Sequence, residues 1–151
     1  MADYIAEDLA RLGADQQSTD KDELLLIGRR HIRSNNSWMH NSHRLVKGKP
    51  RWQLLMHPDD LAAHQLQDQS QVRIQSRVGE VQTQVVASDE VMPGVVSLPH
   101  GWGHKRDGVS MEIAQAQGGV SCNDLTDDKL IDQASGNSAL NGVPVRVFAV
   151  Q

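Results

Sequence analysis

Hydrophobic positions in this chain recur mainly with the two-residue period of β-strands. The clearest stretch is 71–87, where alternate residues form one mostly apolar face on either side of Gly79: Val72, Ile74, Ser76 and Val78, then Val81, Thr83, Val85 and Ala87. Strict alternation indicates a half-buried strand, and a glycine between two such strands is typical of a turn. The pattern predicts a hairpin with one face in the core.

Shorter apolar segments predict four further strands, at 24–27, 52–56, 95–98 and 143–149. Before the hairpin, Pro58 and the two carboxylates after it suit the first turn of a short helix. Leu61 and Leu66 are spaced to pack that helix on the sheet. Long polar loops occupy 28–50 and 99–142, so the chain lacks regular helical crossovers. We predict a mainly β fold with short helices, arranged as a small mixed or closed barrel.

The N-terminal segment has a helical period instead. Ile5, Leu9 and Leu12 follow the i, i+4, i+7 spacing of a short amphipathic helix, and a polar stretch after it is interpreted as a linker. A helix this short is marginal on its own. We therefore expect residues 1–23 to end a preceding region and residues 24–151 to form the domain.

Composition narrows the class of protein. The 151 residues suit one domain, and with 38% hydrophobic but only 3% aromatic residues the core must be built from aliphatic side chains. The net charge is −4 and the cations concentrate at 28–51, so we expect neither nucleic acid nor a membrane as a partner. A single cysteine, Cys122, excludes an internal disulfide, an iron–sulfur cluster held by this chain and a CxxC zinc site, and favours a cytoplasmic protein.

The loop after the first strand carries the densest group of hydrogen-bond donors. Gly28 is followed by arginine, hydroxyl and amide side chains: Arg29, Arg30, Arg33, Ser34, Asn35, Asn36 and Ser37. Arginine binds phosphate oxygens bidentately and stays charged, and glycine lets the backbone N–H approach the same group. These residues predict a phosphate site. The alternative interpretation is a solvated basic turn.

The second long loop opens with two histidines, two glycines and a tryptophan: His100, Gly101, Trp102, Gly103 and His104. Indole offers a flat face for stacking, and histidine donates or accepts a hydrogen bond near neutral pH. This segment predicts one wall of a ligand pocket. The alternative is a glycine-rich turn in which Trp102 fills a gap in an aromatic-poor core.

Further along the same loop, Asn123 and Asp124 offer amide and carboxylate acceptors. A carboxylate accepts two hydrogen bonds at once, which matches the N–H groups on the Watson–Crick edge of guanine. The alternative is simple helix capping by Asn123 or Thr126.

Metal binding and catalysis have little support in the sequence. Two histidine pairs have spacings that could share an ion: His40 with His43, and His100 with His104. Neither pair has a cysteine or a carboxylate in register, and no serine lies in a GxSxG motif. We predict no metal site and no catalytic residue in this chain.

Taken in order, these segments resemble the dinucleotide-binding domain that ends the large subunit of the dimethyl sulfoxide reductase family of molybdopterin oxidoreductases, which includes formate dehydrogenases and nitrate reductases. The resemblance covers about residues 24–150. Its parts are LLLIGRR, SNNSWMHN, QLLMHPDDLAAHQL, QVRIQSRVGEVQTQV, PGVVSLPHGWGH, and NDLTDD ahead of SALNGVPVRV.

This resemblance implies a double-psi β-barrel, of the aspartate decarboxylase-like type, with a molybdopterin guanine dinucleotide lying across the loops at one end. The implied contacts are phosphate and pterin at the first loop, pterin at the second, and guanine at the third. The implied residues are Gly28, Arg29, Arg30, Ser34, Asn35, Asn36, Ser37, Trp38, His100, Gly101, Trp102, Gly103, His104, Asn123, Asp124 and Asn141. At SNNSWMHN the chain departs from the threonine- or histidine-rich form common in the family.

The family's metal ligand and iron–sulfur cysteines lie in other domains. The resemblance therefore implies a partial site for a molybdenum or tungsten cofactor, in a chain that is not catalytic alone. The expected partners are the remaining domains of the same oxidoreductase, or a separate catalytic subunit. The alternative function is a protein-recognition module, since double-psi barrels also serve as adaptors, and it predicts an exposed apolar patch and no need for Arg29 or Arg30.

Overall fold

The computed structural model describes residues 2–15, 20, 22–132 and 135–150. Six strands form the centre of the molecule: β1 (Leu24–Arg29), β2 (Leu54–Met56), β3 (Gln71–Gln75), β4 (Glu80–Ala87), β5 (Val95–Pro99) and β6 (Val143–Ala149). The helices are short except the first: α1 (Ala2–Asp15), α2 (His43–Val46), α3 (Pro58–Ala63), α4 (Glu112–Ala116) and the 3₁₀ turn η1 (Cys122–Asp124).

The strands close into a barrel in the order β1, β5, β2, β4, β3, β6. Two neighbouring pairs, β1 with β5 and β2 with β4, are parallel, and the other four are antiparallel. The chain leaves β1 for β2, on the far side of β5, and leaves β5 for β6, on the far side of β1. The pair β2 and β4 repeats this crossing, because β2 leads to β3 and β4 leads to β5. Two such interlocked crossings define the double-psi topology, so the predicted fold class is confirmed.

Alternation in the sequence accounts for the core. Side chains that point into the barrel are buried, including Leu24, Leu26, Val72, Ile74 and Val85, as expected for the inner face of a pleated strand. The predicted hairpin is present as antiparallel β3 and β4, with Val72 opposite Thr83.

The hairpin differs from its prediction at the turn. Strand β3 ends at Gln75, and the Ser76 hydroxyl accepts hydrogen bonds from the backbone N–H groups of Val78 and Gly79 at 3.2 and 3.3 Å. A serine side chain that satisfies turn donors replaces the strand ladder there. Val78 is consequently exposed rather than on the buried face.

Helix α3 begins as predicted, with Pro58 in its first turn. His57 caps it, because its Nδ1 accepts the N–H of Asp59 at 3.2 Å. Leu61 is buried in the helix and Leu66 beyond it. Asp60 is also structural, since its carboxylate accepts the N–H of Gly94 at 2.8 Å, next to β5.

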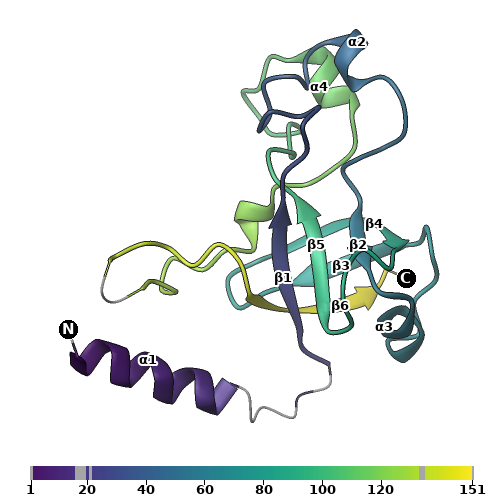
Figure 1. Ribbon diagram of the computed structural model, residues 1–151. Coiled ribbons are helices and arrows are strands. Elements are labelled where there is room, and N and C mark those ends of the chain that lie inside the picture. The colour runs from purple at the N-terminus through teal and green to yellow at the C-terminus, as the bar shows by residue number, and fades with distance from the viewer. Residues whose placement is uncertain (1, 16–19, 21, 133–134, 151) are drawn as a thin grey trace.

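Helix α1 extends the short N-terminal helix predicted from the sequence. It lies beside the lower part of the barrel in Figure 1, away from the loops that follow β1 and β5. Of the linker expected at 14–23, residues 16–19 and 21 lie outside the described part. Among the described residues, no helix has the length and apolar character needed to cross a membrane.

Candidate functional site

Because β1 and β5 are parallel neighbours, the loops that follow them leave the same end of the barrel. These loops, residues 30–53 and 100–121, carry α2 and α4 and build the lobe that stands above the strands in Figure 1. Residues 28–51 contain five arginines and two lysines and no aspartate or glutamate, a formal charge of +7. The rest of the chain must then carry −11 to give the total of −4. We call residues 28–51 the basic segment of the lobe.

Arg29 turns inward and joins three strands. Its guanidinium donates to the carbonyl oxygens of Ser97 and Gln53, each at 2.7 Å, and to that of Arg51 at 3.4 Å. Burial lowers the pKa of Arg29 to about 10. A buried cation is tolerated where backbone acceptors satisfy it. Arg29 therefore holds β1 to β5 and to the approach of β2, and its contact with phosphate stays a prediction.

Arg30, by contrast, is exposed at the mouth of the lobe. Its guanidinium donates to the side-chain oxygen of Asn36. Asn35 and Asn36 both have left-handed backbone, with φ of 43° and 62°, which asparagine adopts more readily than most residues. A hollow of about 470 Å³ is lined by these three residues together with His31, Ile32 and Met39. This hollow has the cation and the amide groups predicted for phosphate binding.

The second loop packs directly against the first. At Gly101, with φ of 88°, a Cβ would collide with the backbone oxygen of Asn36, so only glycine allows the two loops to touch there. At Gly103, with φ of 99°, a Cβ would lie 2.7 Å from the backbone nitrogen of Ser121. The predicted glycines thus serve close approach between loops that are far apart in sequence.

His40 lies at the centre of the lobe and is almost fully buried. Its Nδ1 is 2.8 Å from Nε2 of His104, and its ring stacks on Trp102 with centroids 3.8 Å apart. Burial lowers the pKa of His40 to about 4, and the neighbouring His104 and Arg51 add to that shift. Burial also lowers the pKa of His104. Both rings are therefore neutral near pH 7, and one nitrogen of the pair donates to the other.

The histidine spacings considered for metal binding are thus realised differently. The structure pairs one histidine from each motif, His40 with His104, instead of two within a motif. In the described part of the chain no group of three histidine, cysteine or acidic side chains could hold a metal ion.

Trp102 is buried, whereas the sequence suggested an open stacking face. One of its faces is covered by His40, and its Cβ and Cγ lie close to Gly119. Trp38, from the first loop, is instead 85% exposed. Trp52, which sequence reasoning did not single out, packs on Gly118 so closely that a Cβ there would overlap the indole.

Three polar atoms buried in this lobe have no hydrogen-bond partner: the Ser34 hydroxyl, Nε2 of His40 and Nε1 of Trp102. Buried polar groups are normally satisfied by protein, water or a ligand. All three belong to the loops that the sequence assigned to the pterin and phosphates or to their immediate neighbours, so the chemistry of the lobe fits a polar ligand with donors and acceptors.

Asp124 lines a second hollow, of about 200 Å³, together with Gly103, Lys105 and Arg106. Its carboxylate accepts a hydrogen bond from the Arg106 guanidinium in an exposed ion pair. Asn123 is exposed beside it. Neither Asn123 nor Thr126 caps a helix, because η1 starts after Ser121 and its first turn has no side-chain cap. Arg106 was missed from the sequence, although it follows the HGWGHK run directly.

Asn141 joins the loop before β6 to β1. Its side-chain oxygen accepts the N–H of Gly28 at 2.8 Å. The glycine at position 28 leaves room for this contact, since a Cβ would lie 3.5 Å from the same oxygen. The remaining predicted residue, His100, donates its backbone N–H to the carbonyl oxygen of Arg29 at 2.9 Å and so continues the β1–β5 pairing.

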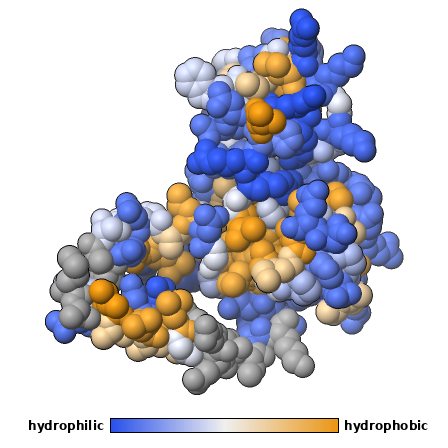
Figure 2. All heavy atoms as spheres, in the orientation of Figure 1, coloured by the Kyte–Doolittle hydropathy of each residue, from blue (hydrophilic) through white to orange (hydrophobic). Residues whose placement is uncertain are grey.

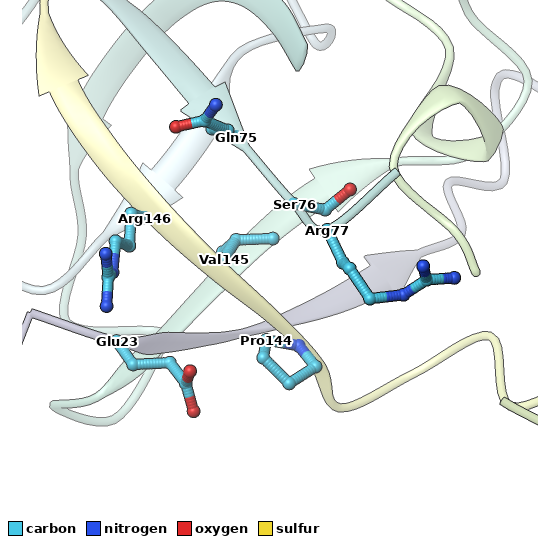
Figure 3. Close-up of a pocket in the computed structure, with 7 residues that line it drawn as sticks. All are labelled: Glu23, Gln75, Ser76, Arg77, Pro144, Val145 and Arg146. Carbon is cyan, nitrogen blue, oxygen red and sulfur yellow. The ribbon is translucent and has the colours of Figure 1, made fainter. Parts of the chain in front are cut away.

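A third hollow, of about 300 Å³, lies on the outer surface of the barrel and contains none of the predicted residues (Figure 3). Its two cations are already compensated: Arg77 pairs with Asp127, and Arg146 pairs with Asp20 at 2.7 Å. The hollow therefore offers an anion little that the protein does not already hold, whereas the basic segment of the lobe concentrates cations without carboxylates.

A double-psi barrel that carries a basic lobe of loops at one end is a scaffold for an anionic ligand with a ring system. The family profile of the Molydopterin dinucleotide binding domain matches residues 24–144. The chain belongs to this family, and the resemblance noted in the sequence is confirmed.

Two relatives extend this comparison. One subunit of the tetrathionate reductase of Salmonella typhimurium (strain LT2) is 31% identical over 121 residues, which cover 69% of this chain and 12% of that protein. Acetylene hydratase from Pelobacter acetylenicus superposes with a TM-score of 0.74 and 17% identity, over 91% of this chain and 20% of that one. At that identity the second comparison shows a shared fold. This chain therefore spans only a small part of the length of either relative.

Proposed function

We propose that the lobe holds a molybdopterin guanine dinucleotide carrying molybdenum or tungsten, as one part of an oxidoreductase whose other domains or subunits hold most of the metal site. The family match supports a molybdopterin-type cofactor. The observation that carries the guanine assignment and the orientation is the convergence of Arg30, Asp124 and the loop glycines at one end of the barrel, beside a segment with seven cations and no carboxylates.

In this proposal each loop has one task. Arg30 and the amides of Asn35 and Asn36 bind phosphate oxygens, for which a guanidinium is suited by its two parallel N–H groups. Asp124 accepts the N–H groups of guanine once Arg106 has moved from its carboxylate. The bound cofactor supplies the redox chemistry, and this chain supplies binding and orientation.

Isothermal titration of the full chain with GDP tests the proposal, with ADP as the control for the base. We expect GDP to bind more tightly than ADP. Arg30→Ala should weaken both ligands to a similar extent, because it removes a phosphate contact. Asp124→Asn should remove most of the preference for GDP, because an amide presents only one acceptor to the base.

Arg73→Ala provides the matched control, since this exposed arginine lies on β3, outside the lobe. It should leave both affinities unchanged. Equal binding of GDP and ADP, unaffected by Asp124→Asn, would contradict the guanine assignment. Binding of GDP that survives Arg30→Ala but is lost with Arg73→Ala would move the phosphate site away from the lobe.

A further inference from the structure

Helix α1 presents an apolar ridge that the rest of the chain leaves uncovered. Tyr4, Ile5, Leu9 and Leu12 are 47%, 56%, 64% and 51% exposed, and they share one side of the helix. Figure 2 shows hydrophobic residues gathered along this helix. Within the described residues, α1 has no extensive packing against any strand or other helix. A helix of this length is only marginally stable without such packing.

The same helix is acidic. Residues 2–15 contain four carboxylates and one arginine, a formal charge of −3, and further acidic residues follow up to Glu23. Its polar residues Glu7, Asp8 and Arg11 line a hollow beside residues 129–139 of the same chain, while the apolar ridge is exposed. The surface that α1 offers is therefore an apolar ridge with acidic edges.

The basic segment of the lobe has the complementary character. Ile32, Trp38 and Leu45 are exposed there, the first two at 89% and 85%. Around them in sequence lie Arg33, Arg44, Lys47 and Lys49, all exposed. Large apolar side chains among cations match an apolar ridge with acidic edges in both respects, and opposite charges also steer the two surfaces together.

We propose that α1 of one chain docks on the basic segment of a second copy, and that the second copy returns the same contact, forming a closed dimer. An amphipathic helix recognised by an apolar surface is a common mode of association. Reciprocal exchange closes the assembly, whereas a one-way contact would produce open chains. The acidic charge of α1 also disfavours an anionic membrane as its partner.

Sedimentation velocity of the full chain, from about 5 to about 500 µM, measures the association. We expect a concentration-dependent dimer at about 50 mM NaCl, with a dissociation constant at least roughly tenfold higher at about 500 mM, because salt screens the charged edges. A chain that stays monomeric over the whole range at low salt would overturn the proposal.

Two variants separate the two surfaces. Leu9→Asp places a charge on the ridge of α1, and Arg44→Glu with Lys47→Glu reverses charge on the lobe. Each variant alone should be monomeric. An equimolar mixture of the two should associate, since one chain retains an intact lobe and the other an intact helix. A mixture that remains monomeric while both variants are folded by circular dichroism would contradict docking between copies.

Met92→Asp is the matched control, because Met92 is equally apolar and 68% exposed on the turn between β4 and β5. It should leave the dimer unchanged. As a second check, Asp3→Lys with Glu7→Lys should restore association to the charge-reversed lobe. None of these positions belongs to the residues assigned to the cofactor, so the GDP titrations can fail or succeed independently.

Discussion

His40 shows how strongly a single buried side chain is governed by its surroundings. It is removed from solvent, stacked on Trp102 and hydrogen-bonded to His104, in a lobe rich in arginine. Burial and the nearby charges favour the neutral ring, so the folded pKa, about 4, lies below the ordinary value of 6.5. Between these two values the unfolded chain binds more protons than the folded chain. The stability that His40 contributes is thus present above pH 6.5 and is lost as pH falls toward 4.

The His40→Gln variant tests this at the residue scale. For the wild-type chain, lowering the pH from about 7.5 to about 5 should cost about 1 to 2 kcal/mol through His40 alone, a fall of several degrees in melting temperature. The variant should show a flatter dependence over that range, with lower stability at the higher pH because the stack on Trp102 is lost. Calorimetry at several pH values measures both.

His43→Gln is the control for that comparison, since His43 is an exposed histidine in the same lobe. Its pH dependence should follow the wild type. A His40→Gln melting curve that shifts with pH as steeply as the wild type would show that the buried pair is not the source of the acid sensitivity.

At the scale of elements, the lobe depends on loops that touch where only glycine fits. Gly101 and Gly108 have similar positive φ values, 88° and 83°, but only Gly101 of these two has a neighbour within contact distance, the backbone of Asn36. Replacing either by alanine introduces the same backbone strain, so the difference between them isolates the loop contact.

We expect Gly101→Ala to lower the free energy of unfolding by about 1 to 3 kcal/mol more than Gly108→Ala, through the forced separation of the two loops. Hydrogen exchange should increase in the first loop, near Asn36, only in the Gly101 variant. Denaturant unfolding measures the energies. Equal losses for both variants would indicate that the loops adjust without cost.

At the scale of the whole molecule, the unequal distribution of charge is the dominant feature. A net charge of −4 conceals +7 on residues 28–51 and −11 on the rest of the chain. An anionic ligand is therefore attracted to one end of the barrel and repelled elsewhere, and screening should weaken that attraction.

The affinity for GDP should fall by about tenfold between low salt and about 500 mM NaCl, while guanosine, which lacks phosphate, should show little change. Titration calorimetry of both ligands provides the comparison. A salt dependence as large for guanosine as for GDP would show that charge acts on the protein itself rather than on the phosphates.

The sequence by itself determined the strands, the hairpin, the first turn of α3 and the segments that carry the ligand chemistry. These follow from local causes: alternation places Val72 and Ile74 on one face, proline fixes the first helical turn, and consecutive arginines concentrate charge. Order along the chain was sufficient to identify the family and its double-psi barrel.

Only the tertiary structure decided which of those residues act together. Arg29 turns toward the carbonyls of Ser97 and Gln53, His40 pairs with His104, and Asp124 pairs with Arg106. The partners in these contacts lie between 18 and 68 positions apart in the chain. The parallel pairing of β1 with β5 brings their loops together, and such long-range crossings leave no periodic trace in the sequence.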